Sequence, residues 1–287
     1  MRHLLTFSVR KPERLVDFLK NQLKTDRSSK YLRRVLEANL CRVNGRVERF
    51  ASARLNAGDR IDLASEWEAL LRSDQKMEAL FEDDHFLIAN KPAGWVCNDE
   101  SAKKTFGPRH YLIHRLDKDT TGLLLIAKTP AIKEKFIALF EKKEVEKFYL
   151  ALADGIFSKE CVEKESFLVK KGTFEGQSIW GSSSSKQGLY AHTRFTPQAQ
   201  GEAATLIDCR PTTGRTHQIR VHLAEMGHPI LIDRQYAATF RCRHFFQRPL
   251  LHAARLRFSH PVTEELIDIS APLPDDMQKG LSLVGIR

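Results

Sequence analysis

The spacing of apolar residues predicts two short amphipathic helices near the start of the chain. The first spans about 12–24, with Pro12 in its first turn, and the second spans about 28–39, with Ser28 as its cap. The apolar positions that share a face are Leu15, Phe18, Leu19 and Leu23 in the first helix and Leu32, Val35 and Leu36 in the second. Each helix therefore has one side to bury against a small core.

An Asn-Gly pair at 44–45 lies between β-prone residues and predicts a hairpin, because both turn positions require a positive φ. A short strand is expected at 60–63. The polar side of the second helix is basic, and the residues on it or just before it are Arg27, Lys30, Arg33 and Arg34. Two helices, a hairpin and a basic helix face suggest a small module at 1–63.

A linker is expected at 64–79, where the charge changes sign and the apolar pattern breaks. From 80 to 287 the pattern becomes rich in strands, with few helices and several tight turns. The expected strands are 85–90, 111–116, 123–127, 147–153, 203–210, 251–258 and 265–270, and helices are expected at 131–143 and 216–227. This mixture predicts an α+β fold with a mixed, mostly antiparallel sheet.

The charge distribution points to a polyanionic partner. The 287 residues include 46 Lys plus Arg and 36 Asp plus Glu, a net charge of +10. Residues 1–63 hold 15 basic and 7 acidic residues, a net charge of +8. Nucleic acid is the commonest partner for such a segment, and an anionic membrane surface is the alternative. A basic face that is merely solvated is also compatible with charge alone.

Several classes of protein are disfavoured by the sequence. No apolar stretch is long enough for a membrane span, and the first residues do not read as a signal peptide. The five cysteines include no CxxC pair, which argues against a disulfide framework or structural zinc and for reduced thiols in the cytoplasm. Neither GxGxxG nor a P-loop occurs, so no nucleotide cofactor is expected. No pair of histidines has a third ligand at zinc spacing, so no metal is expected either.

One acidic residue, Asp117, is predicted to lie in a tight turn between two apolar strands. Such a turn can mount a nucleophile or general base, although an Asp there can also just bond the turn amides. Arg220 lies on the later helix, off the face formed by Ile219, Leu223 and Met226, with Thr216 as the expected cap. An Arg from another element can keep a buried carboxylate charged.

Two resemblances extend this interpretation. The stretch 12–63, with "VNG" at 43–45 and "AGDRI" at 57–61, resembles the S4 RNA-binding domain. The segments "FLIANKPAG", "HRLDKDTTGLLLIAK", "EKFYLALADG", "GRTHQIRVHLAEMGHPIL" and "LHAARLRFSHPVT" occur in order between 86 and 263. Together they resemble the RluA-type pseudouridine synthases, which convert uridine to pseudouridine in RNA.

The resemblance implies roles for individual residues. Asp117 would be the catalytic nucleophile, Arg220 its ion-pair partner and Tyr149 the active-site aromatic residue. Arg115 would enter the RNA stack where the uridine leaves, although a solvated Arg is the simpler alternative. The S4-like residues Arg27, Lys30, Arg33 and Arg34 would contact phosphates, which position a protein without specifying sequence. The histidines at 114, 217, 222 and 252 are interpreted as structural or RNA-facing.

The implied function is a cofactor-independent RNA pseudouridine synthase, monomeric and cytoplasmic, with no membrane partner. Large-subunit ribosomal RNA is the expected substrate, and transfer RNA is the alternative. A non-catalytic RNA-binding or ribosome-assembly factor and a glycosidase that uses Asp117 with Asp119 are weaker rivals. No convincing second acid supports the glycosidase.

Two positions and one stretch of the chain depart from the family pattern. Thr121 replaces the usual Ser but keeps its hydroxyl. Ile232 stands where Gly is usual, which should alter a turn near the active site. The stretch between 94 and 114 is short, so that loop is expected to be trimmed.

Overall fold

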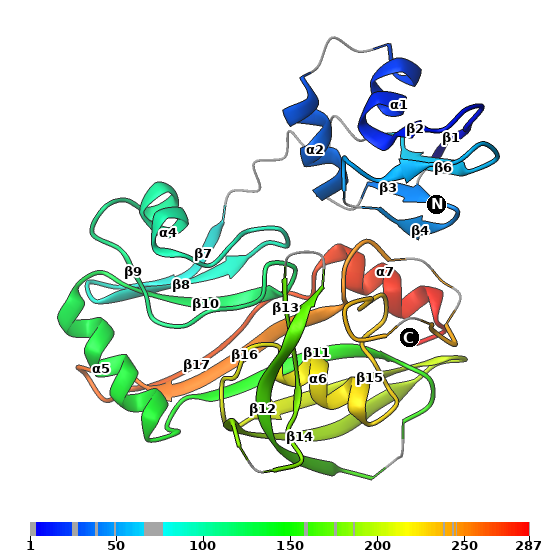
Figure 1. Ribbon diagram of the computed structural model, residues 1–287. Helices are drawn as coiled ribbons and strands as arrows, with labels where there is room; N and C mark the ends of the chain where they lie inside the picture. The colour runs from blue at the N-terminus through cyan, green and yellow to red at the C-terminus, as the bar shows by residue number, and fades with distance from the viewer. Residues whose placement is uncertain are drawn as a thin grey trace. The chain divides into compact units, whose positions relative to one another are not determined.

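The computed structural model forms two units, and their internal contacts separate Met1–Lys76 from Met77–Arg287 (Figure 1). It describes residues 4–24, 28–37, 40–48, 50–65, 77–157, 160–174, 177–185, 187–237, 239–242, 244 and 246–286. The first unit is called the N-terminal unit below and the second the C-terminal unit.

The N-terminal unit packs two helices against a four-stranded sheet of order β1-β6-β3-β4, with a separate β2-β5 pair. Its helices are α1 (Leu15–Gln22) and α2 (Ser29–Glu37), and its strands are β1 (Leu4–Ser8), β2 (Glu13–Arg14), β3 (Cys41–Val43), β4 (Arg46–Val47), β5 (Arg54–Leu55) and β6 (Arg60–Ala64). The apolar faces of both helices form one core with the sheet, as their spacing predicted. Leu32, Val35 and Leu36 are all fully buried.

Local signals in this unit correspond closely to the structure. The Asn-Gly pair forms the β3–β4 turn, with φ of 52° at Asn44 and 77° at Gly45. Ser28 Oγ accepts a hydrogen bond from the Tyr31 amide at 3.3 Å, which caps α2. The first helix, however, begins at Leu15 rather than at 12, because Glu13–Arg14 pairs with β5 instead.

The C-terminal unit is built on one large twisted sheet with few helices (Figure 1). Its strands are β7 (Glu78–Glu82), β8 (Phe86–Lys91), β9 (Tyr111–Leu112), β10 (Thr121–Ala127), β11 (Glu146–Asp154), β12 (Val162–Phe174), β13 (Gln177–Ser182), β14 (Leu189–Gln200), β15 (Ala204–Pro211), β16 (Leu251–Ser259) and β17 (Leu266–Ser270). Its helices are α4 (Asp99–Phe106), α5 (Pro130–Glu141), α6 (Gln218–Glu225) and α7 (Asp275–Leu283).

The sheet order is β13-β12-β14-β15-β11-β16-β10-β8-β7, with β17 paired to β16 and β9 paired to β10. The named pairs within the described residues are antiparallel except β10 with β16. The predicted α+β class with a mixed, mostly antiparallel sheet is therefore confirmed.

Strand β10 is buried on both faces, which explains its uninterrupted apolar run. Leu123 and Leu125 point to a cluster that includes Phe136 of α5, whereas Leu124 and Ile126 point to a second cluster near α4. This central strand therefore gives a rigid base for the loop that precedes it.

Several predicted boundaries were wrong. The strand expected at 111–116 ends at Leu112, and the loop between 94 and 114 holds helix α4. The expected linker at 64–79 overlaps strands at both ends, since Ala64 closes β6 and Glu78 opens β7. Much of this linker, residues 66–76, lies outside the described residues.

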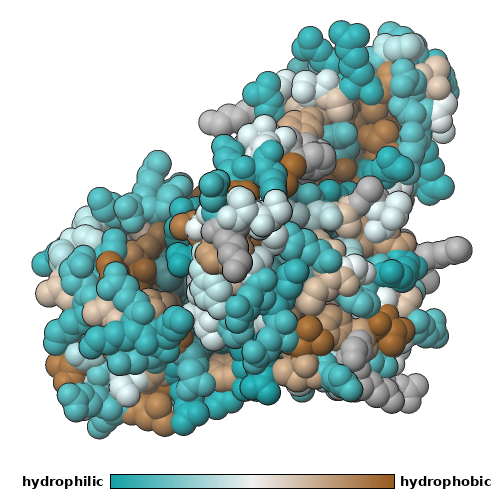
Figure 2. Space-filling view, turned by 60° about the horizontal axis from the view of Figure 1, so that its bottom comes forward, coloured by the Kyte–Doolittle hydropathy of each residue, from teal (hydrophilic) through white to brown (hydrophobic). Residues whose placement is uncertain are grey.

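One face of the protein is mainly polar. On the face shown in Figure 2, hydrophilic side chains dominate and the apolar patches between them are small. Within the ranges described above, every helix is too short or too polar to cross a membrane.

Candidate active site

Asp117 lies in the loop between β9 and β10, and buried cations hold the backbone of this loop. The fully buried Lys91 donates from Nζ to the carbonyl oxygens of Lys118 and Pro92, both at 2.9 Å. Arg248, 3% exposed, donates from Nη1 to the carbonyl oxygen of Asp119 at 3.1 Å. These side-chain bonds to carbonyl oxygens hold the backbone of the loop, so the Asp117 carboxylate is not needed to stabilise the turn.

A close approach of two strands fixes the other end of the loop. Gly122 has φ of 108° and pairs with Ala253 of β16. A Cβ atom at Gly122 would lie 2.1 Å from the Ala253 carbonyl oxygen. Only glycine fits this position, which accounts for the Gly in the HRLDKDTTG segment.

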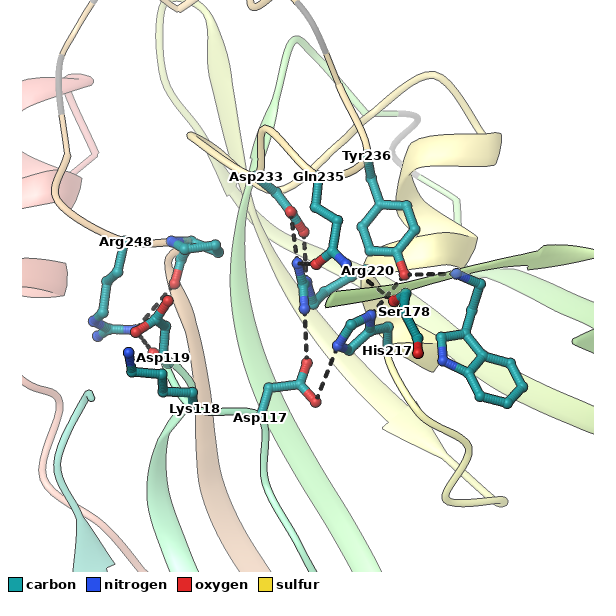
Figure 3. A network of polar contacts seen from close by, with 12 residues as sticks. Asp117, Lys118, Asp119, Ser178, His217, Arg220, Asp233, Gln235, Tyr236 and Arg248 are labelled. Carbon is teal, nitrogen blue, oxygen red and sulfur yellow. Dashed lines mark hydrogen bonds and ion pairs between the residues drawn. The ribbon is translucent and has the colours of Figure 1, made fainter. Parts of the chain in front are cut away.

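The Asp117 carboxylate meets two side chains from the segment around α6 (Figure 3). Arg220 Nη1 donates to Asp117 Oδ2 at 3.1 Å, and His217 Nε2 lies 3.8 Å from Oδ1. The Asp117 side chain is 26% exposed, so solvent or a substrate can reach it. The alternative in which Asp117 binds only turn amides does not match this arrangement.

Arg220 donates hydrogen bonds to three different side chains. Its Nε donates to Asp233 Oδ2 at 2.6 Å and its Nη2 to Asp233 Oδ1 at 2.8 Å. Nη2 also donates to Gln235 Oε1 at 2.6 Å, and the Tyr236 ring lies 5.0 Å from the guanidinium carbon. Asp233 thus takes one edge of the guanidinium fork and leaves Nη1 for Asp117.

The electrostatics of this group follow from its burial. Burial lowers the pKa of Arg220, but attraction and hydrogen bonds from Asp233, with a further contribution from Asp117, outweigh it and raise the pKa overall. Asp233 is 1% exposed, and its charge makes a buried cation tolerable next to Asp117. Arg220 therefore remains charged throughout the physiological pH range.

The turn that carries Asp233 is unusual. Ile232 has φ of 67°, a left-handed conformation that a β-branched residue rarely adopts. Its side chain packs on the cluster that contains Leu231 and Phe246. The departure from the family pattern at Ile232 therefore lies next to Asp233, the residue that holds Arg220. The left-handed backbone of Ile232 costs of order 1–3 kcal/mol in strain.

Helix α6 begins differently from the prediction. Its N-cap is His217, with φ of 56°, and no side chain caps its first amides. Thr216 was therefore wrongly assigned as the cap. Gly227, with φ of 80°, follows the end of the helix as expected.

Tyr149 lies on β11 at a register shift between Phe148 and Tyr149. It packs between the clusters that contain Leu116 and Ile219. Burial raises the pKa of its phenol, and the negative charge of Asp117 raises it further. The phenol is therefore protonated at neutral pH and within the electrostatic reach of Asp117.

The predicted RNA-contacting residues belong to both units. Arg115 is exposed, two positions before Asp117. Arg33 and Arg34 are exposed on α2 in the N-terminal unit. Arg27 and the side chain of Lys30 lie outside the described residues. Of the predicted set, the structure brings together Asp117, Arg220 and Tyr149.

Sequence reasoning missed the second layer of the site, which consists of His217, Asp233, Gln235, Tyr236 and the strand β13. Gln235 Nε2 donates to the Ser178 carbonyl oxygen at 3.0 Å, which ties the turn to β13. A usable signal was present. A buried Arg paired with one half-exposed acid needs further compensation, and the "LIDRQY" segment at 231–236, already noted for Ile232, contains an acid, Asp233.

The other histidines have structural partners. His114 Nε2 accepts from the Leu125 amide at 3.1 Å, His222 lies 2.8 Å from Ser166 Oγ, and His252 lies 2.9 Å from Thr121 Oγ1. In the part of the chain that the structure describes, no group of three or more His, Cys, Asp or Glu side chains has the arrangement of a metal site.

Comparisons with known proteins all match pseudouridine synthases. A family described as RNA pseudouridylate synthase matches residues 85–225. The ribosomal large subunit pseudouridine synthase C of Vibrio parahaemolyticus is 34% identical over 96% of this chain and 93% of its own length. The enzyme of the same name from Escherichia coli K12 is 34% identical over 94% and 92%, respectively.

Solved structures agree on the fold. Human RNA pseudouridylate synthase domain containing 4 superimposes with a TM-score of 0.59 at 23% identity, over 76% of this chain and 94% of its own. Human RNA pseudouridylate synthase domain containing 1 gives 0.59 at 24% identity, over 73% and 95%. These likenesses support the architecture of the C-terminal unit.

Proposed function

Because this chain belongs to the RNA pseudouridylate synthase family, we propose that it is an enzyme that isomerises uridine to pseudouridine in large-subunit ribosomal RNA. The relatives that cover nearly all of the chain carry that substrate in their names. The basic N-terminal segment is suited to a polyanionic substrate of this kind.

The reaction sets the requirements for the site. The N1–C1′ bond of uridine breaks, C1′ joins C5, the proton on C5 leaves and N1 gains a proton. Substrate and product are isomers, so no redox partner or nucleotide is consumed. A charged carboxylate is needed close to the ribose and the base, either as a nucleophile or to accept a sugar proton.

One observation carries the proposal: Asp117 is an accessible carboxylate on a rigid loop, and a buried guanidinium binds one of its two oxygens. Arg220 donates to Oδ2, and Oδ1 lies 3.8 Å from His217 Nε2. A carboxylate held in this way can face a bound ribose without rotating away. We assign Asp117 as the catalytic residue and Arg220 as its partner.

Tyr149 and Arg115 complete the proposed site. Tyr149 offers an aromatic face and a protonated phenol near Asp117, which fits a residue that contacts the uracil or relays a proton. Arg115 is exposed on the same loop as Asp117 and can occupy the space left by an extruded base. Extrusion costs a few kcal/mol, which such a side chain offsets by stacking.

The N-terminal unit is proposed to be an S4-like RNA-binding domain. The exposed Arg33 and Arg34 next to a buried apolar face give α2 the form of a phosphate-binding helix. We further propose a monomer that acts in the cytoplasm, where ribosomal RNA is made. The polar face in Figure 2 and the free cysteines are in keeping with this.

The test is the substitution Asp117→Asn, which keeps the shape of the side chain and removes its charge. Large-subunit ribosomal RNA labelled with tritium at uridine C5 releases tritium when pseudouridine forms. We expect at least a thousandfold slower release, with RNA affinity within a few-fold of the unchanged protein.

The matched control is Asp268→Asn, which breaks a different Asp–Arg contact in the same unit, that with Arg255 on β16. This variant should release tritium at the normal rate. Release by Asp117→Asn at a rate similar to that of the control would refute the assignment of Asp117.

A further inference from the structure

Two donors approach the two oxygens of Asp117 from different sides (Figure 3). Arg220 Nη1 binds Oδ2 at 3.1 Å, whereas His217 Nε2 stands 3.8 Å from Oδ1. The second distance exceeds a hydrogen bond, but catalytic contacts are often long in a free enzyme and shorten with substrate bound. The His217 side chain is only 12% exposed, so it has little freedom to turn elsewhere.

The tautomer of His217 follows from its neighbours. Tyr236 Oη accepts from the Trp180 amide at 3.2 Å and lies 2.6 Å from His217 Nδ1. Within the described residues, no other protein acceptor contacts the Tyr236 hydroxyl, which favours donation of its proton to His217 Nδ1. His217 Nδ1 is then an acceptor, and Nε2 carries the hydrogen that faces Asp117.

The charge state agrees with this assignment. Burial lowers the pKa of His217, Arg220 lowers it further, and Asp117 and Asp233 act in the opposite direction without cancelling the effect. Burial raises the pKa of Tyr236 to about 12. At neutral pH the imidazole is therefore neutral and the phenol is protonated, as the hydrogen-bond pattern requires.

The backbone conformation of His217 also favours the position of its side chain next to Asp117. Its φ of 56° is a conformation that His adopts more readily than most residues. At this N-cap position the side chain makes no bond to the first amides of α6, where a capping residue usually bonds. The side chain instead lies between Tyr236 and Asp117.

Resting on the proposed function, we propose that His217 is a positioning residue for Asp117. Its Nε2–H binds Oδ1 in the complex with RNA, while Arg220 holds Oδ2, and the two donors together fix the rotation of the carboxylate. The Tyr236 hydroxyl, ordered by the Trp180 amide, keeps His217 in the required tautomer. This assigns a function to a His that the sequence did not distinguish from its structural neighbours.

The test compares His217→Gln with His217→Leu. Both side chains meet the same left-handed backbone, so the strain is common to both variants and cancels between them. Gln keeps an N–H donor near the place of Nε2, and Leu keeps bulk without a donor. We expect kcat for tritium release to be at least tenfold lower for Leu than for Gln, with KM for RNA changed less than twofold between them.

A second variant tests the tautomer. Tyr236→Phe removes the hydroxyl and leaves the ring against Arg220. In protein labelled with 15N-histidine, the His217 Nδ1 resonance should be that of an unprotonated nitrogen in the original protein, and both ring nitrogens should shift toward intermediate values in Tyr236→Phe. The His217→Gln spectrum identifies the resonance.

The outcomes are separable. Equal kcat for the Gln and Leu variants, or a protonated Nδ1 in the original protein, overturns the role of His217. Absence of pseudouridine formation by the original protein overturns the proposed function instead. The resonance measurement needs no RNA and stands independently of that result.

Discussion

Asp233 provides the sharpest test of how the site is held together. It is 1% exposed, and its two carboxylate oxygens accept hydrogen bonds from Arg220 at 2.6 and 2.8 Å. The substitution Asp233→Asn keeps the shape and removes the charge. The Asn amide group would then oppose a guanidinium N–H, which is also a donor, so at least one of the two bonds is lost.

The expected cost follows from burial. Arg220 has a side chain 10% exposed and, without Asp233, would keep a single half-exposed carboxylate as its counter-charge. Breaking a buried ion pair from one side costs about 3–5 kcal/mol, because the remaining charge stays desolvated. At roughly 2–4 °C per kcal/mol for a unit of this size, Tm of the C-terminal unit should fall by about 6–20 °C.

The assay is calorimetry together with urea denaturation, and the control is Asp268→Asn. Asp268 is 33% exposed and pairs with Arg255, so its loss should cost far less than the loss of Asp233 because solvent screens the pair. Tritium release by Asp233→Asn should also slow, since Arg220 would be drawn fully onto Asp117. A loss of stability for Asp233→Asn no larger than that of the control would refute this reasoning.

Two further predictions concern the frame of the site and the binding of RNA. Gly122→Ala places a Cβ 2.1 Å from the Ala253 carbonyl oxygen, so the unfolding free energy in urea should fall by at least about 2 kcal/mol. The control is Gly172→Ala, whose Cβ meets nothing within 4 Å and should change the unfolding free energy little. Equal losses of stability in the two variants would contradict the role of the close approach at Gly122. Replacing Arg33 and Arg34 together by Gln should weaken RNA binding and reduce the slope of log K against log salt by about 1.4–1.8, because two phosphate contacts are lost. The same change at the exposed Lys135 and Lys142 of the C-terminal unit is the control, and an unchanged slope for the arginine variant would exclude α2 from the interface.

Local sequence patterns predicted the parts of the fold that depend only on residues close together in the sequence. The β3–β4 turn and the apolar faces of α1 and α2 follow from nearby residues alone. The long strands β12 and β14 were not foreseen, because they are rich in charged and polar residues. In β14 the alternating buried positions are Ala191, Thr193 and Phe195, and the buried Thr hides the apolar pattern. Strand ends such as that of β9 depend on a partner, β10, which no local signal identifies.

The residues of the candidate site also fall into two groups, those that the sequence predicted and those that only the folded structure brings together. The sequence pointed to Asp117, Arg220 and Tyr149 because family-like motifs carry them. It missed Asp233, Tyr236 and the role of His217, because their importance arises only when α6, the turn after it and β13 are folded together. A buried charge needs compensation, but which acid supplies it is a property of the tertiary structure.

The central claim is that the carboxylate of Asp117, held by Arg220, makes pseudouridine in large-subunit ribosomal RNA. The most direct measurement is a pseudouridine map of ribosomal and transfer RNA from cells that lack this gene, complemented with the original gene or with Asp117→Asn. We predict that specific large-subunit positions lose pseudouridine in the deletion strain, regain it with the original gene and stay unmodified with the variant. Restoration of those positions by Asp117→Asn, or a map that the deletion leaves unchanged, would contradict the claim.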